Sequence, residues 1–179
     1  ANPPEDAGHL ELHVRLIPQG HFTTHVFERM KARDILRIEG PLGSFQLNET
    51  SSKPVILLAG GTGFAPIRSI VEHAIRTGIT RPFALYWGSR DQAGLYLREQ
   101  AEGWMQRVPS FRFIPVLSDH DNGWTGRRGL VHHAVMEDWP DLSGHEVYAC
   151  GAPAMIEAAR LDFTTRCGLP VDAFHSDAF

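Results

Sequence analysis

Apolar and polar residues follow two different patterns along the chain, and the change falls near residue 52. Residues 10–16 place leucine or valine at every second position, which is the period-two pattern of a half-buried strand. Residues 36–38 repeat that pattern, and residues 22–30 carry apolar side chains at helical spacing beside two threonines that can cap a helix. Short strands with one helix predict that residues 1–52 form part of a small antiparallel barrel.

The remainder of the chain, residues 53–179, alternates strand and helix signals. It opens on the continuous apolar run 55–59, as expected of a parallel strand covered on both faces. Further strands are predicted at 83–87, 111–117, 146–150 and 173–176, and helices at 66–77, 97–108, 130–139 and 153–167. This order predicts the α/β class, in which a parallel sheet carries helices on both faces.

Composition and charge narrow the range of functions. The chain has 17 lysine and arginine residues against 21 aspartate and glutamate residues, a net charge of −4, so we expect no nucleic-acid partner. No apolar run reaches the roughly 18 residues of a spanning helix, so no membrane segment is expected. Two cysteines are too few for a disulfide scaffold and favour a reducing, cytoplasmic setting. The turn-forming opening Ala1–Pro4 directly precedes an apolar alternation, which predicts that the chain begins inside a domain.

Glycine-containing turns follow three of the predicted strands. They read GGTGFAP at 60–66, GSR at 88–90 and CGAP at 150–153. Glycine lets backbone N–H groups approach a phosphate, and proline suits the first turn of a helix whose amino end attracts an anion. Each turn alone could be a tight strand-to-helix connection, and Arg90 could be a solvated loop residue. Ligands of parallel sheets bind beyond the carboxyl ends of the strands, so three such turns together predict a dinucleotide crevice.

These turns match a known family. The stretches 60–66, 86–90 (YWGSR) and 148–153 (YACGAP) resemble the nucleotide-binding motifs of the ferredoxin–NADP reductase superfamily. The stretch 116–129, with VLS and WTGRRG, and the ending FHSDAF at 174–179 match as well, so the resemblance covers essentially the whole chain. Within the superfamily the chain resembles the reductase components of bacterial oxygenases, and CDP-6-deoxy-Δ3,4-glucoseen reductase-like proteins in particular.

Two upstream stretches, GHFTT at 20–24 and GPLGSF at 40–45, resemble the flavin-domain motifs of the same family. The resemblance therefore implies that residues 1–52 are the C-terminal half of an FAD-binding barrel and residues 53–179 an NAD(P)-binding domain. The family's Arg-x-Tyr-Ser flavin motif precedes the matched segment and is not in this chain, so we expect the chain by itself to hold FAD weakly or not at all. A plant-type [2Fe–2S] domain, which many relatives carry, would lie outside this chain.

The resemblance also implies roles for individual residues on the flavin side. Val14 and Arg15 would lie along the flavin and its phosphates. Gly20, Phe22 and Thr23 would hold the flavin pyrophosphate through backbone N–H groups and a hydroxyl.

On the nicotinamide side, the matching positions are Gly61, Thr62, Gly63, Pro66, Gly88, Ser89, Arg90, Cys150, Gly151 and Pro153. Residues of the first turn would hold the pyrophosphate, those of the second would contact the adenosine ribose, and those of the third would sit beside nicotinamide C4. Cys150 would act there as a small positioning residue, although simple strand-end packing explains it equally well. Asp177 and Phe179 would flank the flavin ring, with the aromatic as a movable lid that nicotinamide must displace.

The function implied by the resemblance is hydride transfer from NAD(P)H to FAD, followed by electron transfer to an iron–sulfur acceptor. The cofactors carry this chemistry, and the protein supplies alignment. NADH is favoured over NADPH because Asp91 follows Arg90 and no further basic cluster lies close in the sequence. The alternative is a nucleotide-binding regulatory or interaction module without redox turnover, which would not need the terminal Phe179. A Ser/His/Asp hydrolase does not fit, because no serine sits in a G-x-S-x-G turn.

The 10 histidines are not expected to bind a metal. Pairs 9/13 and 21/25 have i, i+4 spacing, but the first pair lies on an extended segment, where four residues span about 13 Å. The second pair straddles a turn with no cysteine nearby. His132 and His133 are adjacent on a predicted helix, so they should point to different faces and lie at the surface.

Overall fold

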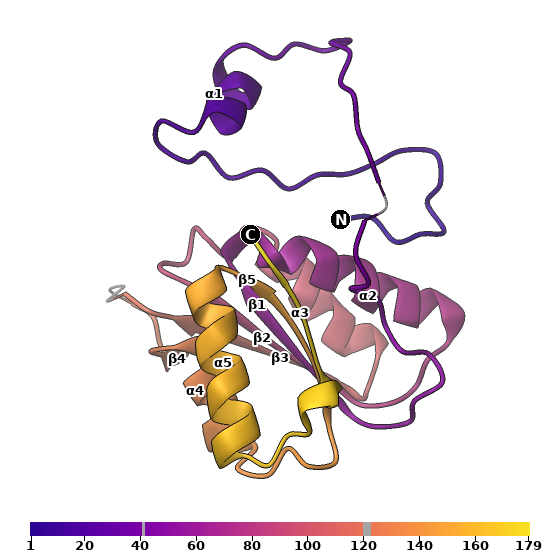
Figure 1. Cartoon of the computed structure of the whole chain (residues 1–179), viewed down its shortest axis with the longest axis vertical. Coiled ribbons are helices and arrows are strands. Elements are labelled where there is room, and N and C mark those ends of the chain that lie inside the picture. The colour runs from indigo at the N-terminus through magenta and orange to yellow at the C-terminus, as the bar shows by residue number, and fades with distance from the viewer. Residues whose placement is uncertain (41, 120–122) are drawn as a thin grey trace.

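One parallel sheet organises the C-terminal two thirds of the chain in the computed structural model, which describes residues 1–40, 42–119 and 123–179 (Figure 1). Its six strands lie in the order β4-β3-β2-β1-β5-β6. In chain order they are β1 (Val55–Gly60), β2 (Phe83–Ser89), β3 (Phe111–Leu117), β4 (Arg127–Arg128), β5 (Glu146–Gly151) and β6 (Phe174–Ala178). The helices are α1 (His21–Glu28), α2 (Phe64–Thr77), α3 (Arg98–Arg107), α4 (Val131–Asp138) and α5 (Pro153–Arg166), with short 3₁₀ turns η1 (Gly61–Gly63) and η2 (Val171–Ala173).

The predicted α/β class is confirmed, and the predicted helices and sheet strands are present within two residues of their expected ends. Strand β4 was not predicted, because two residues are too short to show any periodicity. It pairs with the end of β3, where Val116 faces Arg127 and Leu117 faces Arg128.

The strand order places a reversal at the centre of the sheet. From β1 the chain moves outward through β2 and β3 to β4, and then returns to the other side of β1 with β5 and β6. The connections that leave β1 and β5 therefore run in opposite directions, which opens a crevice at the carboxyl ends of these two strands. At that edge Ala59 is in register with Trp87 on one side and Cys150 on the other.

The sheet is covered on both faces, and each face has its own core. Leu57 and Ala59 point into a core with residues of α2 and α3, while Ile56 and Leu58 point into a second core with residues of α4 and α5. Figure 1 shows the two helix pairs on opposite sides of the strands. All but the last residue of β1 are buried, which is why its sequence is continuously apolar rather than alternating.

The N-terminal segment, residues 1–52, does not form the strands that its alternation predicts. Within the described part of this segment only α1 is regular, and residues 10–16 and 36–38 lie outside any strand. The physical reason is the lack of neighbours, because a strand needs a paired backbone on at least one side and a covered face to be stable. The expected helix is present as α1, with no buried residue. Pro41, from the second flavin-like stretch, lies outside the described residues.

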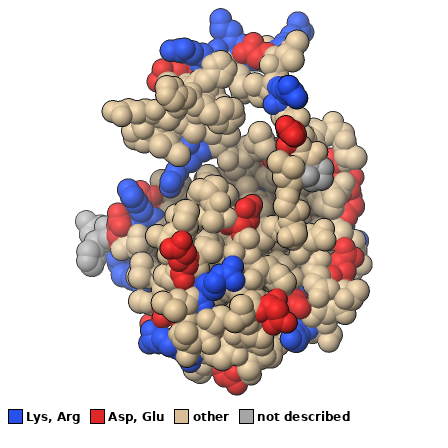
Figure 2. Space-filling view, viewed as in Figure 1, with Lys and Arg blue, Asp and Glu red and all other residues tan. Residues whose placement is uncertain are grey.

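Polar contacts attach the first residues of the N-terminal segment to α2, while Phe45 and Leu47 near its end pack against the core of the sheet domain. Arg76 donates two hydrogen bonds to the carboxylate of Asp6, at 2.6 and 3.0 Å. Arg68 donates to Glu11 at 2.6 Å, and the Ser69 hydroxyl donates to a backbone carbonyl near the start of the chain at 3.0 Å. The segment crosses the carboxyl edge of the sheet and leaves a recess beneath it (Figure 2).

A buried ion pair fastens the connection between the segment and the sheet at the opposite edge. Arg81 donates to Glu146 at 2.8 Å, and both side chains are almost fully buried. The same guanidinium donates to the carbonyls of Asn48 and Lys53, at 2.9 and 3.2 Å. Breaking such a pair would leave a buried charge without a partner, which costs free energy. The pair therefore fixes the position of the residues that lead into β1.

Among the described residues, no helix is both long enough and apolar enough to cross a lipid bilayer.

Candidate dinucleotide crevice

The three glycine-containing turns meet at one edge of the sheet, as their sequence positions predict. They line a crevice of about 550 Å³, to which the first turn contributes Gly61, the second Gly88, Ser89 and Arg90, and the third Ala152. The amino ends of α4 and α5 close the crevice on its remaining sides. A pocket of this size, lined by backbone turns and small side chains, is typical of a small-molecule or cofactor site.

The first turn is held in shape by close backbone packing. A Cβ on Gly63 would lie 2.1 Å from the carbonyl oxygen of Cys150, a distance that no side chain could tolerate. Gly61 has a left-handed φ of 53°, which glycine adopts without strain. Gly63 is thus required by the contact between the turn and β5, whether or not a ligand is bound.

An aromatic stack, which was not predicted from the sequence, supports this turn from below. Phe64, the first residue of α2, stacks on Trp87 with ring centroids 3.8 Å apart and an interplanar angle of 6°. The indole N–H of Trp87 donates to the Gly61 carbonyl at 2.9 Å. Both rings are fully buried. The available signal was the position of each aromatic directly beside a glycine turn, where packing is tightest.

Pro66 and Pro153 lie at the amino ends of their helices, outside the residues that line the crevice. Pro153 is the first residue of α5, where its fixed φ favours the start of a helix. Pro66 is the third residue of α2 and lines a separate depression with Ser69 and His73. Pro153 thus begins its helix and Pro66 lies in the first turn of its own, and each helix follows one of the glycine turns.

The second turn carries the predicted ribose contacts, and its loop is folded by Asp91. The carboxylate of Asp91 accepts a hydrogen bond from the backbone N–H of Gly94 at 2.9 Å. A Cβ on Gly94 would lie 1.9 Å from the Ser89 hydroxyl, so the loop passes very close to that side chain. Arg90 is exposed, and both Arg90 and Asp91 line the crevice. An acidic and a basic side chain thus stand side by side there.

The third turn brings Cys150 next to the C-terminal strand. Cys150 is in register with Asp177, and Gly151 with Ala178. Burial raises the pKa of the Cys150 thiol to about 12, with a further contribution from the Asp177 carboxylate. The thiol is therefore protonated at neutral pH, and since the thiolate is the nucleophilic form, Cys150 is not a nucleophile.

The recess under the N-terminal segment unites residues predicted on the two sides of the site. It has a volume of about 340 Å³ and is lined by the flavin-side residues Val14, Arg15, Phe22 and Thr23, by Gly61 and Thr62 of the first turn, and by the terminal Phe179. Phe179 is 63% exposed, and its backbone N–H donates to the Gly151 carbonyl at 3.2 Å. The backbone of Phe179 is thus hydrogen-bonded to the third turn, while its ring is largely exposed.

The side chains of Arg15 and Thr23 differ in whether they face the two hollows or make hydrogen bonds within the N-terminal segment. Arg15 lines the crevice and the recess, and its guanidinium lies 3.5 Å from where a Cβ of Gly61 would be. The Thr23 hydroxyl instead accepts a hydrogen bond from the backbone N–H of Ile17 at 3.1 Å. Gly20 is the residue before α1 and closes the same turn, donating its N–H to the Ile17 carbonyl at 2.9 Å. These contacts shape the amino end of α1.

A second group that sequence reasoning missed joins the N-terminal segment to the loop after β2. His13 Nδ1 lies 2.6 Å from the hydroxyl of Tyr96, and its Nε2 lies 3.1 Å from Glu11. Hydrogen bonds from Arg68 and His13 lower the pKa of Glu11 to about 2. Burial lowers the pKa of His13 and raises that of Tyr96. No sequence pattern links residue 13 with residue 96, because only the fold brings them together.

His132 also lines the crevice, and the prediction that it lies at the surface is wrong. It is 4% exposed and packs between α4 and α5, while the neighbouring His133 is exposed as predicted. Burial lowers the pKa of His132, and the nearby His133 lowers it further. The expectation of an exposed pair failed because α5 covers the first turn of α4.

Known proteins match this chain along its whole length, and two known domain families match parts of it. Residues 57–161 match the oxidoreductase NAD-binding domain family, and residues 1–47 match the oxidoreductase FAD-binding domain family. The chain is 46% identical over 179 residues to CDP-6-deoxy-L-threo-D-glycero-4-hexulose-3-dehydrase reductase of Yersinia pestis, covering 100% of this chain and 54% of that protein. It is 36% identical over 184 residues to NAD(P)H-flavin reductase of Aliivibrio fischeri, covering 100% of this chain and 77% of that protein.

A solved structure agrees with these relatives. The crystal structure of an Amycolatopsis cytochrome P450 reductase matches with a TM-score of 0.83 and 37% identity, over 93% of this chain and 50% of that one. The chain thus spans about half the length of the Yersinia and Amycolatopsis proteins. Because both domain families, the relatives and the fold agree with the glycine turns, the chain belongs to the oxidoreductase NAD-binding domain family, within the ferredoxin reductase-like flavoproteins.

Proposed function

We propose that this protein is an NAD(P)H-dependent flavin reductase that delivers electrons to an iron–sulfur partner. The observation that carries the proposal is the recess in which Phe179 and the first glycine turn face Val14, Arg15 and Phe22. A hydride donor in the crevice and an acceptor under the N-terminal segment would be neighbours there. Residues 1–52 then belong to the flavin domain and residues 53–179 form the nucleotide domain.

The residues of the crevice fit a nicotinamide dinucleotide. Gly61 lines the crevice without a side chain, and Gly88 lets α4 pack closely on the second turn, since a Cβ there would approach Val131 to 2.9 Å. The amino end of α2, a 14-residue helix, follows the first turn and favours a phosphate. Ser89 and Arg90 lie at the rim, where a ribose would contact them.

The residues under the N-terminal segment fit part of an FAD molecule. Arg15 can pair with a flavin phosphate, and backbone groups around Gly20, Phe22 and Thr23 lie at the amino end of α1. When bound, NADH would supply the hydride and FAD would take it up and release single electrons. An iron–sulfur cluster would be carried by another domain or protein, and the electron acceptor would dock there.

The protein's own contribution is alignment and exclusion of water. Cys150 is fully buried and protonated, so it adds no charge at the end of β5, and Gly151 beside it packs closely against Gly60 and Met155. Asp177 and Phe179 end the chain on the same side. The Phe179 ring would cover the reacting face until nicotinamide displaces it, which limits access of water and oxygen.

NADH is the proposed donor. Asp91 lines the crevice beside Arg90, and its carboxylate would repel a 2′-phosphate that Arg90 alone would attract. The two cysteines are both buried and unpaired, which agrees with work in a reducing cytoplasm.

Anaerobic stopped-flow mixing of the FAD-loaded full-length protein with NADH tests the function. We expect rapid bleaching of the flavin band, and a lower kcat/KM with NADPH. Protein that binds NADH without bleaching would be a nucleotide-binding module without redox turnover, and a higher kcat/KM with NADPH would refute the choice of donor.

Replacing Phe179 with Ser tests the lid. We expect tighter NAD⁺ binding, faster oxidation of reduced flavin by oxygen and slower productive turnover, because ring and nicotinamide compete for one site. Val171→Ser is the matched control, since Val171 is also exposed, at 70%, but lies in η2 outside the crevice and the recess. Equal NAD⁺ affinity in wild type and Phe179→Ser would leave Phe179 as an ordinary packing residue.

A further inference from the structure

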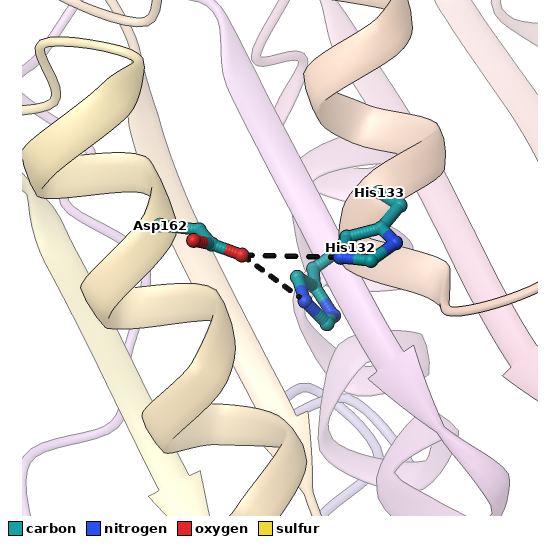
Figure 3. Close-up of side chains that lie close together, drawn as sticks. All are labelled: His132, His133 and Asp162. Atoms are coloured by element: carbon teal, nitrogen blue, oxygen red, sulfur yellow. Dashed lines mark ion pairs between the residues drawn. The ribbon is translucent and has the colours of Figure 1, made fainter.

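Three side chains with metal-binding atoms converge between α4 and α5, at the wall of the crevice. They are His132 and His133 from the first turn of α4 and Asp162 from α5 (Figure 3). One potential ligand atom of each lies within 4.8 Å of the other two. Among the described residues they are the only such group of histidine, cysteine and acidic side chains.

The distances suit a shared ion better than an ordinary hydrogen-bonded pair. Nε2 of His132 lies 3.4 Å from Oδ2 of Asp162, and Nε2 of His133 lies 3.9 Å from the same oxygen. Zinc bonds of about 2.0–2.1 Å place neighbouring ligand atoms of a tetrahedral site roughly 3.3 Å apart. Small side-chain rotations would therefore bring the three atoms to coordination distance.

The surroundings of the group support ligation. The side chain of His132 is only 4% exposed, and its Nδ1 has no hydrogen-bond partner among the described residues. Among the described residues no hydrogen bond to Nδ1 ties the ring to another orientation, so Nε2 can serve as the ligand atom that faces Asp162. Arg166 holds the other oxygen of Asp162, Oδ1, at 3.3 Å, which fixes the carboxylate with Oδ2 turned towards the histidines.

Adjacent histidines on a helix ordinarily point too far apart to share an ion. Here their ring centroids are only 4.4 Å apart, and Figure 3 shows both rings on the side of α4 that faces Asp162. Two imidazoles and one carboxylate are ligands that Zn²⁺ accepts, with a fourth position left for water.

We propose that His132, His133 and Asp162 form a Zn²⁺ site that ties α4 to α5 beside the crevice. The ion bridges two helices whose amino ends both line the crevice, so it braces the wall formed by Val131, His132 and Ala158. It takes no part in the hydride transfer proposed above, and the site stands or fails independently of that function.

Zinc titration of the chelator-treated protein, followed by calorimetry, tests the site. We expect one Zn²⁺ per chain, and binding at least about 100-fold weaker in His133→Gln and in Asp162→Asn, because loss of a ligand costs more than the 10–100-fold typical of an outer-shell partner. The matched controls His25→Gln and Asp172→Asn remove exposed residues of the same types elsewhere and should bind Zn²⁺ like wild type.

Cobalt gives a second readout. Co²⁺ in place of Zn²⁺ should produce visible absorption bands in wild type and both controls, and none in the two ligand variants. If Asp162→Asn unfolds, His133→Gln decides, since His133 is half exposed and its loss leaves the helix contact intact. Absence of stoichiometric binding in wild type, or equal binding in His133→Gln, would overturn the site.

Discussion

The sheet domain and the N-terminal segment contain the same kinds of apolar residues, but they bury them to very different extents. Leu57 and Leu58 of β1 are fully buried, whereas Leu12 is 60% exposed and Ile35 is 97% exposed. Each strand at the centre of the sheet has a paired strand on both sides and helices on both faces. In the segment Phe45 and Leu47 pack against the core of the sheet domain, but Leu12 and Ile35 have no such partners, and hydrogen-bonded charges on α2 hold the first residues of the segment in place. An apolar pattern therefore shows only which side chains could be buried. Whether they are buried depends on the elements that pack against them.

The largest expected effect comes from truncating equivalent leucines in the two regions. Leu57→Ala should lower the free energy of unfolding by about 3 kcal/mol, because it leaves a cavity in a closed core. Leu12→Ala should change it by less than about 0.5 kcal/mol, because the side chain is already in water. Urea denaturation of both variants measures the difference. Similar losses for the two leucines would mean that the segment has a core of its own.

Two glycines of the sheet domain allow the same comparison between a close-packed position and an open one. Gly63→Ala should cost about 2–3 kcal/mol and weaken NAD⁺ binding, because its Cβ would overlap the Cys150 carbonyl. Gly103→Ala is the control, since no atom lies within 4 Å of that position in the middle of α3, and alanine there should stabilise by up to about 1 kcal/mol. Thermal unfolding with and without NAD⁺ checks both. A Gly63→Ala variant as stable as wild type would remove close packing as the reason for this glycine.

The attachment of the N-terminal segment should depend on pH. The folded-state pKa of Glu11 lies at about 2, below its ordinary value of 4.5. A lowered pKa contributes stability that is fully present above pH 4.5 and is lost as the pH falls through about 2. The pair is partly exposed, so the effect should be about 1 kcal/mol or less.

Hydrogen exchange of residues 1–17 between pH 5 and pH 2, corrected for intrinsic rates, measures this attachment. Glu11→Gln should flatten the pH dependence, whereas Glu28→Gln, on the exposed face of α1, should leave it unchanged. An equally steep dependence in Glu11→Gln would assign the effect to other carboxylates.

The smallest expected effect concerns two tyrosines. Tyr96→Phe removes the hydroxyl that lies 2.6 Å from His13 and should weaken attachment of the segment by roughly 0.5–1 kcal/mol, without changing global unfolding. Tyr86→Phe removes a hydroxyl that donates to Asp138 and accepts from Trp139 inside the sheet domain, so it should lower global stability instead. Exchange rates near residue 13 and urea midpoints separate the two effects. A lower urea midpoint in Tyr96→Phe would show that segment and sheet unfold together.

The sheet could be predicted because its signals are local. An uninterrupted apolar strand followed by glycine and an amphipathic helix has few alternatives, so the strands and helices from β1 to β6 were predicted, apart from β4. The strands predicted for the N-terminal segment are absent from its described residues, because the same local alternation depends on distant partners. The convergence of the three glycine turns was predictable from topology, since carboxyl ends of parallel strands share an edge.

Taken by itself, the sequence determined the α/β class, the three turns and the family to which they belong. Tertiary structure alone decided which side chains meet across those elements. It stacks Phe64 on Trp87 beneath the first turn, places His13 against Tyr96, and buries His132 opposite Asp162. Hydrophobic periodicity and turn-forming residues depend on a few neighbouring positions, so they can be recognised in the sequence. Contacts between residues tens of positions apart depend on how helices cross the sheet, which no local pattern specifies.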